Sequence, residues 1–221
     1  IVMNNVGGDV FATATPIPGQ AAGATVYYTV TADNDLPDQT VSDELNYSLP
    51  FTVTVQDIQG LGAISPHLGD EVVTSGVVTA DFGSTFVIQA GSGPYSGLWV
   101  EGVAAPAVGS LVEVRGQVQE LDSNTTVTGA QINSTVAGSL PAAEVLTTGA
   151  AVGEEWEGVL VQVLNAACTV SDQETMNWAV SNSGGAVEVD DLGWADTSVT
   201  MMDGDPDSRS DFHQTPHLET L

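Results

Sequence analysis

Short apolar runs, rich in β-branched residues and ended by glycine, proline, serine or aspartate, follow one another along almost the whole chain. Clear examples are residues 25–31 (TVYYTVT), 72–79 (VVTSGVVT) and 111–118 (LVEVRGQV). β-Branched and aromatic side chains fit a pleated strand, and closely spaced turn residues leave little room for helices. Many short strands of this kind are typical of β-sandwiches and small barrels. The pattern therefore predicts an all-β chain.

Alternation within the runs predicts which side chains face the interior. In residues 111–118, valines alternate with Glu113, Arg115 and Gln117, so one face of that strand is apolar and the other polar. We expect a closed or nearly closed small barrel over about residues 56–195. Its interior is predicted to include Val73, Val77, Val78, Phe86, Ile88, Trp99, Val112, Val114, Val118, Val159, Val161 and Val163.

The charge of the chain is strongly one-sided. The 221 residues hold 29 acids and two bases, Arg115 and Arg209, for a formal net charge of −27. Binding to nucleic acid or to anionic membranes needs Lys and Arg, so neither is expected. No apolar run approaches the about 20 residues of a membrane-spanning helix, and membrane insertion is not expected either. Cations such as Ca²⁺, or only the salt of an extracellular medium, would offset the self-repulsion.

The first residues indicate a piece of a longer protein, which we expect to be secreted or surface-exposed, whereas cysteine use says little. Cys168 is the one cysteine, so no internal disulfide forms, and its apolar run indicates a buried small side chain rather than a nucleophile. Residue 1 lies in an apparent strand without an initiator methionine. We therefore expect that any secretion signal lies outside this sequence.

Residues 1–54 resemble the end of an immunoglobulin-like or fibronectin-like domain. The resemblance rests on residues 21–35 (AAGATVYYTVTADND), which are similar to the final hairpin of such domains in large secreted bacterial proteins. About fifty residues are too few for a complete sandwich of about a hundred. The resemblance therefore implies a partial domain that ends near residue 54.

Residues 55–197 resemble the OB-fold-like domain that accompanies secreted bacterial endonucleases, esterases and surface lipoproteins. The matching elements follow in order: residues 55–60 (VQDIQG), 69–80, 86–89, 96–100 (SGLWV), 108–118 with Ser110 where Asp is common, 155–161 (EWEGVLV) and 187–192. The resemblance implies an OB-like barrel. Since this domain is generally an accessory to a separate catalytic domain, it implies no catalytic residues here.

The C-terminal residues 198–221 form an acidic loop and tail with one candidate calcium site. Its four acids occupy positions one, three, five and nine of a calcium-loop spacing: Asp203, Asp205, Asp207 and Asp211. Position six is Ser208 rather than Gly, position twelve is Gln214 rather than Glu, and no flanking helices are expected. The alternative is a solvated acidic loop.

Three smaller groups of residues are weaker candidates for a metal site, and each also has a simpler structural explanation. Asp33, Asp35 and Asp38 suit a turn, and Asp190–Asp191 suit an exposed strand face. His213 and His217 have the spacing of two zinc ligands on a helix, but Pro216 between them disfavours a helix.

Two functions remain open at this stage. The first is a non-catalytic binding, spacer or assembly module of a secreted or cell-surface bacterial protein, stiffened by Ca²⁺, whose partners are other surface proteins or further copies of itself. The second is the accessory domain of a secreted nuclease or phosphoesterase whose catalytic domain lies outside this sequence. The residues that would follow Leu221 in the parent protein discriminate between them.

Overall fold

The computed structural model describes residues 1–8, 10–32, 40–171, 178–189 and 210–214. Its regular structure is almost entirely β, as the runs of β-branched residues predict, with only very short helices. The chain divides into two compact units, residues 1–50 and residues 51–221. Within the described residues, no helix is both long and apolar enough to cross a membrane.

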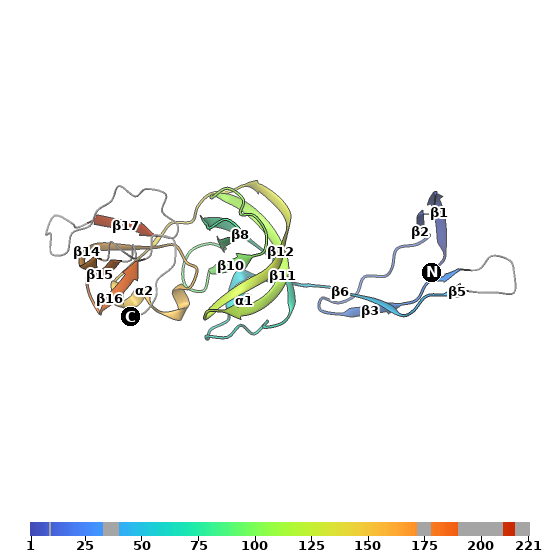
Figure 1. Ribbon diagram of the computed structural model, residues 1–221, viewed down its shortest axis with the longest axis horizontal. Coiled ribbons are helices and arrows are strands. Elements are labelled where there is room, and N and C mark those ends of the chain that lie inside the picture. The colour runs from blue at the N-terminus through green and yellow to red at the C-terminus, as the bar shows by residue number, and fades with distance from the viewer. Residues whose placement is uncertain (9, 33–39, 172–177, 190–209, 215–221) are drawn as a thin grey trace. The chain divides into compact units, whose positions relative to one another are not determined.

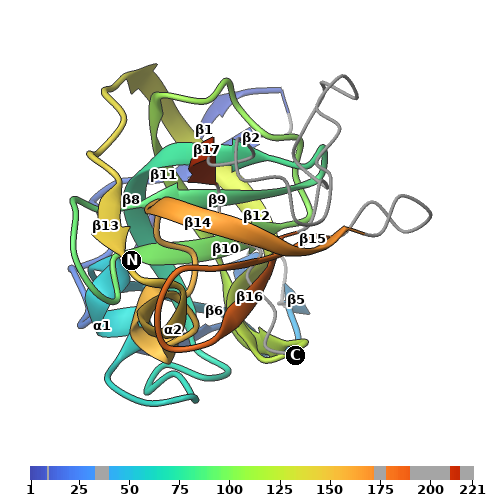
Figure 2. The same cartoon turned by 90° about the vertical axis from the view of Figure 1, so that its left-hand side faces the viewer.

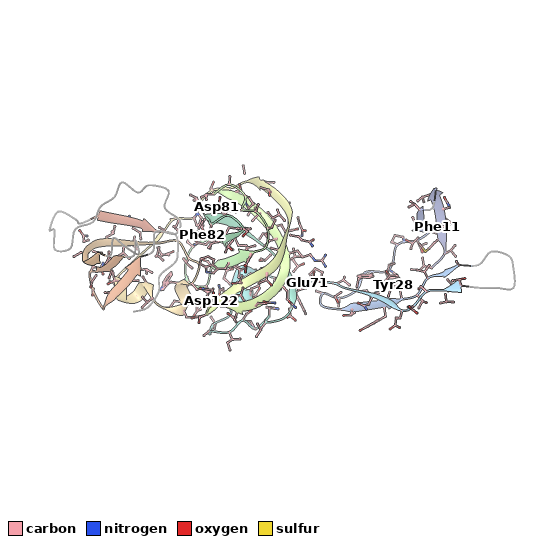
Figure 3. All side chains as sticks on the ribbon, viewed as in Figure 1. Phe11, Tyr28, Glu71, Asp81, Phe82 and Asp122 are labelled. Carbon is pink, nitrogen blue, oxygen red and sulfur yellow. The ribbon has the colours of Figure 1, made fainter. Side chains whose placement is uncertain are left out.

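The first unit consists of three antiparallel strand pairs. They are β1 (Met3–Gly7) with β2 (Val10–Thr13), β3 (Thr25–Tyr28) with β6 (Leu45–Ser48), and β4 (Thr31–Ala32) with β5 (Thr40–Val41). None of the described residues in this unit is buried. Figure 3 labels Phe11 and Tyr28, which stand on two different pairs. The unit therefore holds strands without a core of its own among the described residues.

In the second unit, five strands close into a ring. They are β8 (Glu71–Asp81), β9 (Thr85–Gln89), β10 (Gly97–Glu101), β12 (Asn124–Ala137) and β11 (Ser110–Leu121). The ring closes because β11 pairs with both β12 and β8. All these pairings are antiparallel except that of β10 with β12, which is parallel. A short strand, β7 (Phe51–Thr52), adds to β8 in parallel. Figure 1 labels β8, β10, β11 and β12 of the ring.

The interior of the ring is a single apolar cluster. The helix α1 (Val55–Gln59) contributes Val55 and Ile58 to it, both fully buried. This helix begins with a capping box, in which the Thr54 hydroxyl accepts from the Asp57 backbone N–H and the Asp57 carboxylate accepts from the Thr54 backbone N–H. It ends at Gly60, whose φ of +70° suits glycine.

A second sheet follows the ring. Its strands are β13 (Glu144–Leu146), β14 (Val161–Ser171), β15 (Trp178–Ser181), β16 (Ala186–Val189) and β17 (Ser210–Gln214), and Figure 2 shows β14, β15 and β16 in succession. Two short helices, α2 (Thr148–Ala151) and the 3₁₀ helix η1 (Glu154–Trp156), connect β13 to β14. A separate small cluster forms the core of this part, with Ala151, Val163, Ala166, Val180 and Val187 buried.

The interior predictions are confirmed for half of the residues. Six lie in the ring cluster: Val78, Phe86, Ile88, Val112, Val114 and Val118. Val73 and Val77 are only partly buried, and Val159 and Val161 are buried but lie outside the ring strands. Val163 belongs to the second cluster. The ring spans residues 71–137 and is therefore smaller than the barrel expected over about 56–195.

Trp99 is buried, but in a third cluster rather than the ring interior. It lies with Ala80 and Val87, and its ring stacks on that of Phe82 at a centroid distance of 5.7 Å. Figure 3 labels Phe82, which follows β8. Since Leu98, Trp99 and Val100 are all apolar, alternation in the sequence cannot tell which of them point inward; Leu98 and Val100 do.

Candidate functional site

The segment between α2 and β14, residues 153–160, lies against the ring and is named here the docking turn. A Cβ atom added to Gly97, the first residue of β10, would lie 2.0 Å from the carbonyl carbon of Gly158. The two backbones therefore touch where any side chain would separate them. Gly158 also has a φ of +64°, which glycine adopts without strain. Local sequence thus permits a close backbone contact between the docking turn and β10.

Two hydrogen bonds, one between backbone groups and one between backbone and side chain, hold the docking turn. The N–H of Tyr95 donates to the carbonyl of Glu155 at 2.6 Å. At the other end, the N–H of Leu160 donates to Oε1 of Gln89 at 2.9 Å. Gln89 is fully buried, and its amide nitrogen donates to the carbonyl of Gly91. A buried amide of the ring is therefore satisfied partly by the docking turn.

Glu157 sends its carboxyl group from the docking turn to two other elements. Its Oε1 accepts the backbone N–H of Thr125 on β12 at 2.8 Å and the side-chain amide of Gln59 on α1 at 3.3 Å. Gln59 is almost fully buried and also donates to the carbonyl of Gly97 at 2.8 Å. The second oxygen, Oε2, is buried and has no hydrogen-bond partner among the described residues.

A second carboxylate lies next to this one. Glu120, on β11, accepts the Thr125 hydroxyl at 3.2 Å with both of its oxygens and the backbone N–H of Ser65 at 2.8 Å. Thr125 therefore bridges two acids, because its backbone N–H donates to Glu157 and its hydroxyl donates to Glu120. These contacts join α1, the β11–β12 hairpin and the docking turn in one polar cluster.

Burial raises the pKa of Glu157 to about 7 from an ordinary value of 4.5. The hydrogen bonds from Gln59 and Thr125 oppose this rise because they favour the charged form, and the negative charges of Glu154 and Glu120 add to it. At neutral pH this carboxyl is thus divided between its protonated and ionised forms. The cluster can hold and release a proton.

A cavity of about 400 Å³ is the other candidate. It lies where the pairing of β7 with β8 ends, at Thr52 and Val73, and the pairing of β9 with β8 begins, at Gln89 and Val77. Its lining includes Thr52, Thr54, Gln56, Thr74, Ser75 and Glu113. The Thr74 hydroxyl has no partner among the described residues but is closed to solvent, so a molecule in the cavity would not reach it. The cavity is therefore lined by polar groups but offers no buried polar atom that a ligand could reach.

Most of the metal candidates lie outside the described residues. These are Asp203, Asp205 and Asp207 of the calcium candidate, Asp33, Asp35, Asp38, Asp190 and Asp191, and His217. Asp211 and His213 belong to β17, whose backbone pairs with β14. Cys168 lies in β14. Within the part of the chain that the structure describes, no group of three or more His, Cys, Asp or Glu side chains is arranged to hold a metal ion.

The polar cluster around Glu157 was not predicted from the sequence as a site. Its one local signal is an acid placed between Trp156 and the apolar residues that follow Gly158. Gln59 and Thr125 carry no such signal, because they meet Glu157 only through contacts across 98 and 32 residues.

No protein-family model matches this chain, and comparisons with curated proteins and with solved structures likewise found no match.

Proposed function

We propose that this chain is a non-catalytic binding and assembly module of a secreted or cell-surface bacterial protein. One observation carries the proposal: none of the described residues of the first unit is buried, although its strands bear large apolar side chains. Such strands are stable only when something covers them, since an isolated two-stranded pair is marginal in water. The first unit therefore presents a surface that another protein face, in the same parent protein or in a partner, would cover.

Tyr28 of β3 and Tyr47 of β6 are the centre of that surface, since the register of the pair puts them on the same face. They are 41% and 40% exposed, whereas Tyr27, 61% exposed, belongs to the opposite face. The rings of Tyr28 and Tyr47 meet edge to face at a centroid distance of 6.2 Å. Aromatic rings gain about 25 cal/mol for each Å² removed from water, and tyrosine is enriched at protein interfaces.

The partner that fits this surface is a protein face of β-strands that is apolar and not acidic. Residues 1–50 contain six acids and neither Lys nor Arg, so a second copy of this unit would meet like charge. The resemblance of residues 21–35 to the last hairpin of an immunoglobulin-like domain supports the same partner, because the opposing sheet of a sandwich covers such a hairpin.

The ring supports the accessory role of the second unit. A closed five-stranded antiparallel ring with one parallel pair suits the OB-like barrel that the sequence resembles. In the family that it resembles, this barrel accompanies other domains. The acidity of the whole chain supports an extracellular setting, where salt and Ca²⁺ screen it.

Hydroxyl-radical footprinting tests the proposal. Tyr28 and Tyr47 are labelled in the isolated chain and in the parent protein from its native source, with Tyr27 of the opposite face and the buried Trp99 as internal references. We expect Tyr28 and Tyr47 to react readily in the isolated chain and at least several-fold more slowly in the parent protein. Equal labelling in both samples would show that nothing docks on this surface and would overturn the proposal.

A further inference from the structure

The docking turn connects two separately packed parts of the second unit. The ring has its own apolar cluster, and the second sheet has another. Between them stand polar and backbone contacts: Tyr95 to Glu155, Leu160 to Gln89, and Glu157 to Thr125 and Gln59. Contacts of this kind depend on charge more than apolar packing does.

Among these contacts, the carboxyl of Glu157 is the one group that can change its charge near neutral pH. Its Oε1 is held by two donors, whereas Oε2 is buried without a partner among the described residues. Burying this oxygen costs little free energy while the carboxyl is neutral. Once the carboxyl is ionised, a charged oxygen is left without solvent or a hydrogen-bond donor, and the cost is much higher.

The charged groups that face Glu157 add to this cost. Glu154 of η1 and Glu120 of β11 both act on it as negative charges. From α1 and β12 it receives only the neutral amide of Gln59 and the N–H of Thr125. Ionisation would therefore place a third negative charge in a partly buried cluster of acids.

We propose that Glu157 is a proton-operated latch: its protonated carboxyl holds the docking turn against the ring, and its ionisation releases the turn and loosens the second sheet from the ring. The latch does not depend on the proposed function, because it acts within the second unit and the proposed docking surface lies on the first.

The direction and size of the effect follow from the two pKa values. Burial raises the pKa of Glu157 to about 7 in the docked form, whereas a released carboxyl would return to about 4.5. The docked form thus binds the proton more tightly, and docking is strongest below about pH 4.5 and weakens as the pH rises to about 7. A difference of this size changes the equilibrium between docked and released forms by up to roughly 300-fold.

Hydrogen–deuterium exchange from pH 5 to pH 8, corrected for the intrinsic exchange rate, measures this equilibrium in the full chain. We expect the protection of residues 153–163 to fall by tens of fold or more across this range, while β8–β12 stay protected. In Glu157→Gln, which keeps the size and the acceptor oxygen but cannot ionise, protection should stay constant. Glu155→Gln removes the neighbouring acid and is the matched control; it should behave as the wild type does.

A second variant keeps the test decisive if Glu157→Gln fails to fold. Glu154→Gln removes one of the negative charges that raise the pKa of Glu157 in the docked form, so the loss of protection should end at a lower pH and be smaller than in the wild type. The latch is refuted if wild-type protection of residues 153–163 does not change with pH. It is equally refuted if Glu157→Gln shows the wild-type change, or if Glu154→Gln leaves its midpoint in place.

Discussion

The backbone N–H of Thr125 donates to Oε1 of Glu157 across 2.8 Å, although 32 residues separate the two in the chain. The donor belongs to a strand of the ring and the acceptor to the docking turn. The same threonine gives its hydroxyl to Glu120. One residue of β12 therefore ties the carboxyl of Glu157 to Glu120, one of the two acids that raise its pKa.

Glu157→Gln should change the pH dependence of stability. The pKa of Glu157 is about 7 in the folded chain and near 4.5 in the unfolded chain, so the stability that its proton contributes is complete below about pH 4.5 and is lost as the pH rises to about 7. The variant should resemble the wild type at pH 5 and exceed it at pH 8, by up to about 3 kcal/mol. Urea unfolding at both pH values measures the difference, with Glu155→Gln as control. A variant less stable than the wild type at pH 8 would contradict this assignment.

Gly97→Ala should destabilise the second unit. The new methyl group would lie 2.0 Å from the Gly158 carbonyl carbon, and because the obstructing atoms are backbone, no side chain can turn away. Overpacking of this kind costs about 1–3 kcal/mol. Thermal unfolding should show the loss, whereas Gly62→Ala, where no atom lies within 4 Å of the added Cβ, should stay near the wild type. Equal melting temperatures for the two variants would mean that the docking turn does not rest on Gly97.

Trp99→Ala should cost about 3–5 kcal/mol in free energy of unfolding, as large-to-small changes at buried aromatic positions do. The side chain is 8% exposed and stacks on Phe82. Denaturant titration followed by circular dichroism measures the loss, and Tyr27→Ala, at a position 61% exposed, is the comparison. A loss below about 1 kcal/mol would place the indole on the surface in solution.

Single-stranded DNA or RNA should show no measurable affinity in about 0.15 M salt. A strand of phosphates needs a basic groove, and of the two arginines Arg115 already donates to Glu71 at 2.7 Å, while Arg209 lies outside the described residues. Fluorescence anisotropy with a labelled oligonucleotide is the measurement. Micromolar binding that weakens steeply with salt would revive a nucleic-acid function.

Calcium should raise the melting temperature beyond what sodium does at matched ionic strength, if the acidic loop holds the ion. The expected ligands are Asp203, Asp205, Asp207 and Asp211. In the double variant Asp205→Asn/Asp207→Asn, the calcium-specific shift should vanish. A shift that survives both substitutions would mean that calcium binds elsewhere, with Asp33 and Asp35 as the next candidates. The absence of any shift would mean that the acidic side chains are only solvated and bind no calcium.

The all-β class of this protein follows from its sequence alone. Runs such as residues 111–118 alternate with period two, and that period is a local property that side-chain chemistry imposes on each strand. Val112, Val114 and Val118 accordingly lie in the ring interior. Local alternation also has a limit, seen at Trp99: where neighbours on both sides are apolar, it does not say which face of the strand is the inner one.

The closure of the ring, its extent along the chain and the polar cluster were decided only by the tertiary structure. The parallel pairing of β10 with β12 and the return of β11 to β8 join residues far apart in the chain, and no local pattern records them. Val163 looks like a residue of the ring interior but packs in the second cluster for the same reason. Glu157 is an ordinary glutamate in the sequence; its pKa rises because packing removes water from its carboxyl and brings Glu120 and Glu154 near, and neither burial nor proximity exists before the chain folds.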